Sequence, residues 1–428
     1  MSLEYTIRRF EPSRDSEAVA RIMMEVGWQR PGEKDERLQA RRQFQDAAAG
    51  FVAEAGGEPE CYVSTMSGSY QYRDDALPFA GVTGVITSRV ARKQGLASRT
   101  TARALAYQAN EGAVVAGLGI FDQGFYNKLG FGTTAYDIYA TFDPASLTVP
   151  YCRRRPVRLT AADLGEMHQA RLHRRLRHGS VSLDDAATTL MGVSASETSF
   201  GLGFRDDETG ELTHCFWVST DNVGSGPYRV LWTSFTTVAQ FVELLGLLRN
   251  FGDQVYTVWI PEPSGIQLQD FLDRPFRRRE QGRRGKHETS TAASAGFQYR
   301  IMDVPAAVAA AAGALRGRGT KLPSFTMRVT DPVARYLPEG TEWKGCAGVY
   351  RVGPDGAEVL VQASAGSAAD RQTDVDLEIG VADLTRAWLG VLPISTLKDT
   401  SHVRVAGDLA EALDDAFAGP APHTDWFY

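Results

Sequence analysis

The residues that could carry chemistry are concentrated between positions 82 and 132. A basic turn, Arg92-Lys93-Gln94-Gly95-Leu96-Ala97, follows a stretch with strand character and runs straight into a stretch with helical spacing. A helix N-terminus presents free backbone N–H groups and the positive end of the helix dipole, which suits a pyrophosphate. Gly95 would let the backbone approach such a ligand closely. An ordinary charged turn before a helix is the alternative interpretation.

A tyrosine follows the next predicted strand. It lies in the segment Phe125-Tyr126-Asn127-Lys128-Leu129-Gly130-Phe131. The hydroxyl of Tyr126 could give or take a proton in a reaction. A half-buried core tyrosine is the commoner role, but the order and separation of the two segments favour chemistry.

The elements that would position these residues can be predicted from hydrophobic patterns. Residues 79–87 are apolar, β-branched and interrupted by glycine, which predicts a buried strand. Residues 98–110 have helical spacing, and residues 113–120 predict a second buried strand. The succession of strand, basic turn, helix and strand indicates an α/β core.

The rest of the chain predicts further domains. A chain of 428 residues is long enough for two or three of them. Composition shifts near residues 144–156, and residues 158–260 indicate a second α/β unit. From about residue 321, closely spaced strands and two short helices indicate a small α+β domain with an antiparallel sheet. The basic and then polar segment 277–296 predicts a surface loop, with a binding role for its arginines as the alternative.

Composition excludes several function classes. The formal net charge of −6 argues against a general nucleic-acid partner. The absence of a long apolar segment predicts a cytoplasmic protein without a membrane partner. The four cysteines and seven histidines show no ligand spacing, so we expect no metal.

The ordered pair R-x-x-G-x-A at 92–97 and F-Y-x-x-x-G-F at 125–131 resembles the GNAT superfamily of N-acetyltransferases. Over the whole chain the sequence is similar to the Eis ("enhanced intracellular survival") family, through RVARKQGL, GFYNKLGFG and FQYRIMDVPAAV. The resemblance implies tandem GNAT-like α/β domains followed by an α+β domain. They would be a catalytic GNAT domain at 1–150, a degenerate GNAT-like domain at 151–300 and a sterol-carrier-protein-like domain at 301–428. Between 157 and 300 we find no second R/Q-x-x-G-x-G/A turn, so the middle domain is expected to be structural.

The resemblance also implies a mechanism. The co-substrate would be acetyl-CoA, with its pantetheine arm paired to backbone groups at Val85, Ile86 and Thr87 and its pyrophosphate held by amides from Arg92 to Ser98. The substrate amine would attack the thioester directly, while Tyr126 protonates the departing thiolate. The carboxylate of the last residue, here Tyr428, would deprotonate the amine. An alkylammonium has a pKa near 10, so it must lose a proton before it attacks.

Substrate identity is the least determined part of the resemblance. Trp28, Phe125, Asp425 and Trp426 are candidates to line the substrate pocket, with ordinary core packing as the alternative for the aromatic residues. The resemblance favours an aminoglycoside-like polyamine, and other polyamines, lysine side chains and arylalkylamines stay open. Gln94 and the loop before Trp28 depart from the family pattern. The resemblance further implies a homohexamer. The alternative function is a non-enzymatic protein that binds an apolar ligand in the sterol-carrier-like domain.

Overall fold

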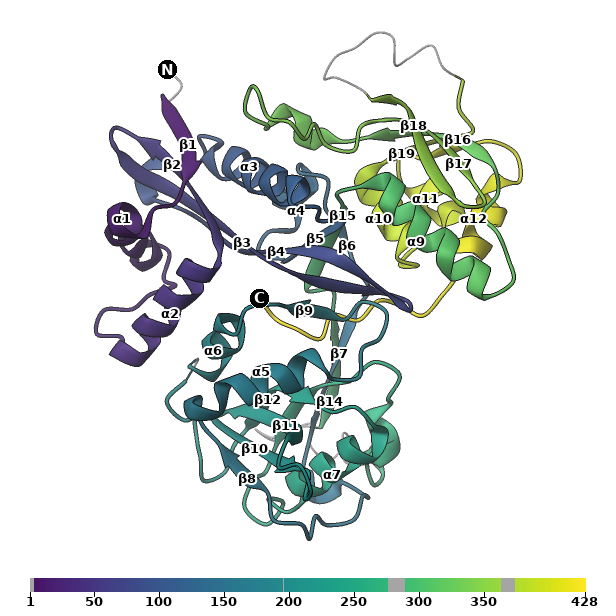
Figure 1. Cartoon of the computed structure of the whole chain (residues 1–428). Coiled ribbons are helices and arrows are strands. Elements are labelled where there is room, and N and C mark those ends of the chain that lie inside the picture. Colours follow the sequence, from purple (N-terminus) through teal and green to yellow (C-terminus); the bar gives the residue numbers. More distant parts are fainter. Residues whose placement is uncertain (1–3, 195, 276–288, 363–373) are drawn as a thin grey trace.

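The described residues form three β-sheets covered by helices (Figure 1). The computed structural model describes residues 4–194, 196–275, 289–362 and 374–428. The predicted class, tandem α/β sheets followed by an α+β domain, is confirmed. Within the described ranges, each helix is too short or too polar to cross a bilayer.

The first sheet has the order β1-β2-β3-β4-β5-β15-β6, and β4 and β5 are parallel. Helix α3 covers one face through Leu105, and α1 covers the other through Ile22, because each helix carries one apolar stripe. The predicted strands at 79–87 and 113–120 and the helix at 98–110 are confirmed. The elements are β1 (Tyr5–Arg9), α1 (Pro12–Glu25), α2 (Asp35–Ala47), β2 (Ala49–Ala55), β3 (Glu58–Tyr72), β4 (Asp75–Thr87), η1 (Arg89–Ala91), α3 (Leu96–Asn110), β5 (Val115–Gly119), α4 (Gln123–Asn127), β6 (Gly132–Thr133) and β15 (Phe297–Ile301).

The second sheet has the order β14-β7-β13-β12-β11-β10-β8, and β12 and β13 are parallel. The strands of the two sheets can be matched by position, counting from β1 in the first sheet and from β8 in the second. By this match β12 and β13 occupy the positions of β4 and β5. The elements are β7 (Asp137–Phe142), η2 (Pro144–Ser146), β8 (Val157–Leu159), η3 (Ala161–Asp163), α5 (Leu164–Leu172), α6 (Ala187–Val193), β10 (Phe200–Arg205), β11 (Leu212–Ser219), β12 (Tyr228–Ser234), α7 (Val238–Arg249), β13 (Val258–Pro261), η4 (Leu268–Phe271) and β14 (Ser290–Ser294). The short strand β9 (Val181–Leu183) lies between α5 and α6 in the chain but pairs with β3 of the first sheet.

The two sheets exchange a strand. Strand β7 comes before most of the second sheet in the chain, yet it pairs with β13 and β14. Strand β15 comes after the second sheet, yet it pairs with β5 and β6 of the first. Strand β7 therefore completes the second sheet, and strand β15 completes the first. The prediction of a surface loop at 277–296 is wrong for Ser290–Ser294, which form β14 against β7, and residues 276–288 lie outside the described residues.

The third sheet belongs to the C-terminal domain and has the order β18-β17-β16-β19-β20. The predicted antiparallel sheet is wrong at one pair, because β16 and β19 are parallel. The chain between Thr330 and Leu377, which includes β17 and β18, is longer than the crossover of roughly a dozen residues that a parallel pair needs. The elements are α9 (Val304–Gly317), β16 (Phe325–Thr330), η5 (Pro332–Arg335), β17 (Gly348–Gly353), β18 (Gly356–Gln362), β19 (Leu377–Gly380), α10 (Val381–Trp388), α11 (Ile394–Thr400), β20 (Arg404–Val405) and α12 (Leu409–Phe417).

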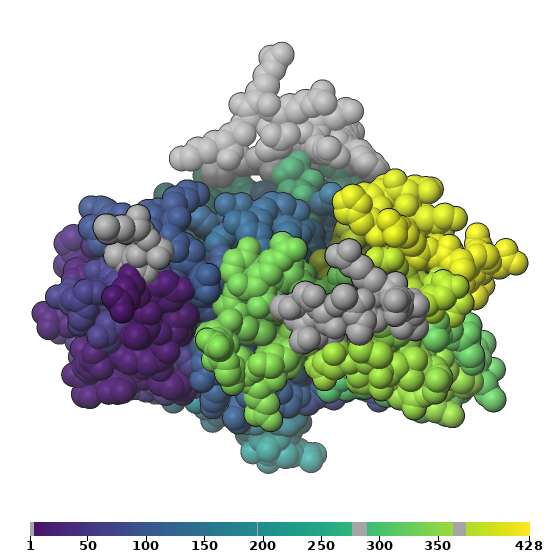
Figure 2. Space-filling view, turned by 90° about the horizontal axis from the view of Figure 1, so that it is seen from above, coloured from purple at the N-terminus to yellow at the C-terminus, as the bar shows by residue number. Residues whose placement is uncertain are grey.

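The C-terminal domain packs directly on the first sheet, and Figure 2 shows its green and yellow residues beside the blue ones. The indole of Trp388 on α10 stacks on the ring of Tyr72 on β3, with centroids 4.1 Å apart and planes 2° apart. Arg300 on β15 and Asp331 form a fully buried ion pair of 2.6 Å. After α12 the chain runs back between the first two sheets as an extended tail, residues 418–428 (Figure 1).

Candidate active site

The central strand β4 carries a β-bulge next to the point where it parts from β5. Its register against β3 shifts between Ser64 and Thr65, which leaves Thr83 as an extra residue on β4. The pairing of β4 with β5 ends at Val82 and Leu118, whereas β4 runs on beyond Thr83. Bulges of this kind commonly adjoin active sites because they re-aim the strand. The result is an opening between two parallel strands at their carboxyl ends.

Val85, Ile86 and Thr87, which the family resemblance implies as cofactor-binding residues, lie on the open part of β4. The side chain of Ile86 is only 3% exposed and packs toward α1, while Val85 packs toward α3. The side chains are therefore core residues, and only main-chain groups that point away from β3 are free to pair. An extended chain that contains amides, such as pantetheine, can bind such an edge as an added strand.

The turn after β4 leads into a helix that has no side-chain cap. Gly95 occupies the N-cap position of α3 with φ 82°, and no side chain accepts a hydrogen bond from the first turn. A Cβ atom built on Gly95 would meet no atom within 4 Å, so the space in front of the helix is open. Lys93, beside it, has φ 63°, a left-handed conformation that is strained for a residue other than glycine.

The residues of this turn divide between surface and core. Arg92, Lys93, Gln94 and Gly95 are exposed, and Ala97 is half-buried. Leu96 and Ser98 are buried, so only their backbone amides could reach a ligand. Free N–H groups, a helix dipole and exposed cations are the features that bind a phosphate. The turn therefore fits the pyrophosphate of a coenzyme A molecule.

Tyr126 lies on α4, on the α3 side of the first sheet. Asp122 begins this helix and accepts a hydrogen bond from the Gly124 N–H at 3.0 Å. Tyr126 is 7% exposed and shares a core cluster with Val82 and Leu118, the last paired residues of β4 and β5. Burial, together with the charge of Asp122, raises the pKa of Tyr126 to about 12. The hydroxyl therefore keeps its proton at neutral pH and can act as an acid.

Phe125, a predicted substrate contact, lies next to Tyr126. The two rings meet edge to face with centroids 4.9 Å apart. Phe125 is half-buried, and the ammonium of Lys128 lies 5.2 Å from its ring centroid. This aromatic pair packs with the core cluster that contains Val82 and Leu118.

Tyr428 stands over the point where β4 and β5 diverge, on the opposite face from Tyr126. A Cβ atom on Gly81 would lie 3.1 Å from the Tyr428 ring, and one on Gly117 would lie 2.5 Å from its hydroxyl. Gly81 and Gly117 are paired residues of β4 and β5, one step before the pairing ends. The ring of Tyr428 also meets Phe79 edge to face at 5.7 Å. Sequence reasoning missed the two glycines, although both interrupt stretches that it predicted as buried strands.

Trp28 lies on the same face of β4 as Tyr428. Its ring comes within 3.8 Å of a Cβ atom built on Gly84, and it is 45% exposed. Since the bulge adds one residue at Thr83, Gly81 and Gly84 face the same side of the sheet. This side, bordered by Trp28 and Tyr428, is where an acceptor could approach the opening.

Asp425 and Trp426 point into the second domain. The Asp425 carboxylate accepts hydrogen bonds from Arg174 at 2.8 and 2.5 Å and from the Ser180 hydroxyl at 3.0 Å. Burial opposes its charge, but attraction and hydrogen bonds from Arg174 outweigh burial, so the pKa of Asp425 is lowered. The Trp426 ring is fully buried, with the Arg171 guanidinium 3.6 Å from its centroid. Contact of these two residues with substrate stays a prediction, and their observed contacts favour a role in holding the tail.

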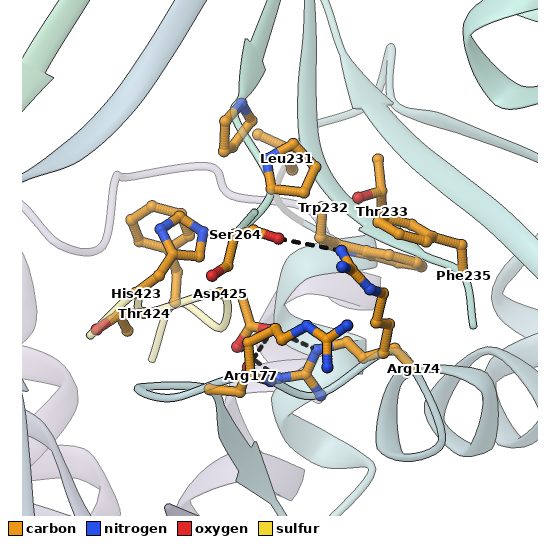
Figure 3. Close-up of a pocket in the computed structure, with 15 residues that line it drawn as sticks. Arg174, Arg177, Leu231, Trp232, Thr233, Phe235, Ser264, His423, Thr424 and Asp425 are labelled. Carbon is orange, nitrogen blue, oxygen red and sulfur yellow. Dashed lines mark hydrogen bonds and ion pairs between the residues drawn. The ribbon is translucent and has the colours of Figure 1, made fainter. Parts of the chain in front are cut away.

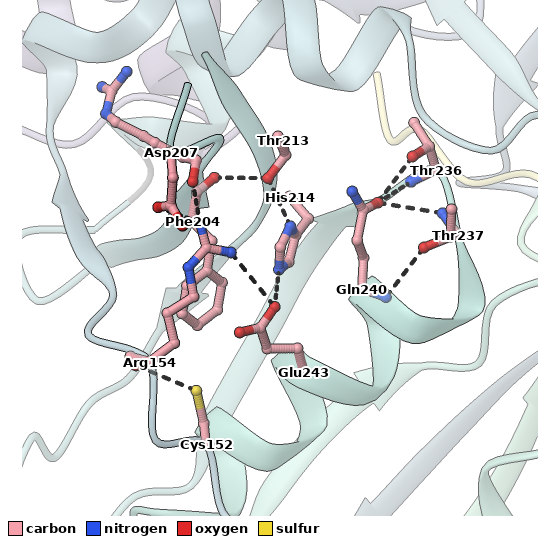
Figure 4. Close-up of polar contacts among 11 residues, drawn as sticks. Cys152, Arg154, Phe204, Asp207, Thr213, His214, Thr236, Thr237, Gln240 and Glu243 are labelled. Carbon is pink, nitrogen blue, oxygen red and sulfur yellow. Dashed lines mark hydrogen bonds and ion pairs between the residues drawn. The ribbon is translucent and has the colours of Figure 1, made fainter. Parts of the chain in front are cut away.

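The second sheet lacks an open phosphate site at the corresponding helix. The Thr237 hydroxyl caps α7 by accepting a hydrogen bond from the Gln240 N–H at 3.2 Å (Figure 4). The side-chain oxygen of Gln240 in turn accepts from the N–H groups of Thr236 at 2.8 Å and of Thr237 at 3.2 Å. This capping box satisfies donors that α3 leaves free. Farther along α7, Glu243 accepts a hydrogen bond from His214 at 3.0 Å.

Among the described residues, no group of three or more His, Cys, Asp and Glu side chains is placed to hold a metal ion.

Comparison with known proteins agrees with this geometry. The acetyltransferase (GNAT) domain family matches residues 6–134, and the sterol carrier protein domain family matches residues 308–425. A search of curated proteins finds no match.

Solved structures with the same fold extend over the whole chain. One is a probable N-acyltransferase from Enterococcus faecalis, with 14% identity, 99% of this chain and 100% of that chain covered, and a TM-score of 0.75. Another is a GCN5-related N-acetyltransferase from Kribbella flavida, with 16% identity, 100% and 99% covered, and a TM-score of 0.71. A third is Eis1 from Mycobacterium abscessus, with 15% identity, 99% and 100% covered, and a TM-score of 0.70.

The match to the acetyltransferase (GNAT) domain family identifies residues 6–134 as an acetyl-CoA-dependent acetyltransferase domain. Residues 6–134 thus match a GNAT acetyltransferase domain and residues 308–425 a sterol carrier protein domain, and the whole chain shares its fold with Eis1.

Proposed function

We propose that this protein transfers the acetyl group of acetyl-CoA to the amine of a small polyamine or aminoglycoside-like substrate. The observation that carries the proposal is the position of Tyr428, over Gly81 and Gly117, one step before the pairing of β4 and β5 ends. Acetyl-CoA would supply an activated thioester at this opening. The protein's own groups would bind the co-substrate, orient it and move two protons.

The binding role falls to the backbone. The open edge of β4 from Val85 to Thr87 would hold the pantetheine arm, and amides from Arg92 to Ser98 would hold the pyrophosphate. Arg92 and Lys93 would add charge that also steers the anion toward the opening. Trp28 and Phe125 would border the acceptor on two sides.

The proton transfers fall to two tyrosines that approach the opening from opposite faces. Tyr126 would donate its proton to the departing thiolate, because its raised pKa keeps it protonated. The main-chain carboxylate of Tyr428 would take the proton from the substrate ammonium. Asp425 and Trp426 would act indirectly, because they hold the tail that carries Tyr428.

We also propose the assignment of a catalytic domain at 1–150, a structural GNAT-like domain at 151–300 and a C-terminal domain at 301–428. The exchange of β7 and β15 means that these units share strands. A cytoplasmic location and a homohexamer are further proposals that come from the family resemblance.

The test is release of CoA with a panel of amines. The panel would contain an aminoglycoside, a linear polyamine, a lysine peptide and an arylalkylamine. We expect release with the polyamine or the aminoglycoside, and mass spectrometry should show a gain of one acetyl group per modified amine. Release from none of the four would contradict the proposal.

A further inference from the structure

The second sheet retains the opening that the first sheet uses. Strands β12 and β13 pair in parallel only at Tyr228 with Val258 and at Arg229 with Trp259. The register of β12 against β11 then shifts, which leaves Leu231 as an extra residue. Leu231 on β12 thus corresponds to Thr83 on β4. The second sheet therefore has its own bulge and its own gap between diverging parallel strands.

This gap is hollow. A cavity lies between the end of β12 and the residues that follow β13, and the loop 174–180 and the tail complete its walls (Figure 3). Trp232 and Phe235 contribute aromatic walls, and Phe427 of the tail lies at the same cavity. Because Thr237 and Gln240 cap α7, a coenzyme A molecule would find no free pyrophosphate site next to this gap.

Two of the arginines that line the cavity have no carboxylate partner among the described residues. The Arg175 guanidinium donates a hydrogen bond to the Ser264 carbonyl at 3.0 Å. No carboxylate of the described residues lies within 4.0 Å of the charged nitrogens of Arg175 or Arg177, whereas Arg174 is paired with Asp425. Burial, and then repulsion by Arg177, lower the pKa of Arg175. A bound anion would relieve this repulsion, and guanidinium groups suit carboxylate and phosphate oxygens.

We propose that the cavity between β12 and β13 binds a small oxyanion ligand, a carboxylate or a phosphate ester, through Arg175 and Arg177. The apolar part of the ligand packs against Phe235. The site lies beyond the acetyl-transfer site, and it does not depend on the roles proposed there. It is linked to that site through the tail, since Arg174 at the cavity wall holds Asp425.

The experiment is calorimetric titration of the full-length protein at constant ionic strength. The probes are benzoate and inorganic phosphate, which separate a carboxylate preference from a phosphate preference. The protein is saturated with CoA so that the turn at Gly95 is occupied, and the titration is repeated in Gly95→Asp without CoA. The test variant is Arg175→Ala/Arg177→Ala. The control is Arg229→Ala, which removes an exposed arginine of β12 outside the cavity.

We expect at least one probe to bind, and the double variant to weaken its affinity by about tenfold or more, the loss that follows when a charge-assisted contact is removed. Arg229→Ala should bind as the wild type does. Arg177→Glu, at an exposed position, provides the same test if the double variant does not fold. Absence of binding by both probes, or equal affinity in the double variant and Arg229→Ala, would overturn the proposal.

Discussion

Arg174 and Asp425, 251 residues apart in the chain, form a two-point ion pair of 2.8 and 2.5 Å. Arg174 follows α5 in the second domain, and Asp425 lies three residues before Tyr428. The pair therefore fastens the tail whose last residue stands over the opening of the first sheet. Both partners are largely buried, with side chains 5% and 22% exposed.

Asp425→Asn should free the tail. It leaves the buried Arg174 without a counterion, so we expect the free energy of unfolding to fall by about 3 kcal/mol, as when one partner of a buried pair is removed. Turnover should fall as well, because Tyr428 loses its position.

The pH dependence identifies the cause of this loss. The pKa of Asp425 is lowered in the folded state. The ion pair therefore adds its full stability to the folded protein above the unfolded pKa of about 4, and this stability is lost as the pH falls through the folded pKa. Urea unfolding should show a large difference in the free energy of unfolding between variant and wild type at about pH 7. This difference should become smaller as the pH falls below about 4. A difference that does not change with pH would contradict the ion-pair account.

Gly95→Asp should abolish the stabilisation of the protein by acetyl-CoA. The new carboxylate would stand at the open N-terminus of α3 and repel the phosphates. The matched control is Gly112→Asp at the other end of α3, since both glycines have positive φ and open space around the Cβ position. Both variants should lose about 1 kcal/mol of stability from backbone strain. Only Gly95→Asp should lose the rise in melting temperature with acetyl-CoA. An equal rise in the two variants would count against the assigned turn.

Tyr126→Phe should lower kcat by about 10²–10⁴-fold, the usual range for an acid–base group, while acetyl-CoA still binds. Tyr107→Phe is the control, since Tyr107 packs against the same core cluster. Because burial raises the pKa of Tyr126 to about 12, wild-type activity should not decline through loss of this proton below about pH 11. Near-normal turnover in Tyr126→Phe would make the residue a packing residue.

Residues added after Tyr428 should abolish acetyl transfer while leaving acetyl-CoA binding intact. The extension converts the terminal carboxylate into an amide, which cannot accept the ammonium proton. Deletion of Tyr428 should have the same effect, and the same tag at the N-terminus is the control. The measurements are CoA release and the acetyl-CoA thermal shift. Full activity in a folded, extended protein would show that the terminus is not the base.

The motifs around Arg92 and Tyr126 could be identified from sequence because they are local. A turn, a helix start and a tyrosine one strand later are separated by short stretches of chain, and hydrophobic spacing predicts the elements between them. The strands around Gly81 and Gly117 were predicted for the same reason. What spacing could not show is that these two glycines are register partners below an aromatic ring from the end of the chain.

By itself the sequence determined the local elements, the basic turn, the position of Tyr126 and the succession of three folded units. The tertiary structure alone decided that β7 and β15 exchange sheets, that Arg174 meets Asp425 and that Tyr428 reaches the opening between β4 and β5. The physical reason is that a strand edge needs a hydrogen-bonding partner and a buried charge needs a counterion. Tertiary packing decides which residue takes that role. Residues hundreds of positions apart leave no periodic signal that would reveal such a pairing in one sequence.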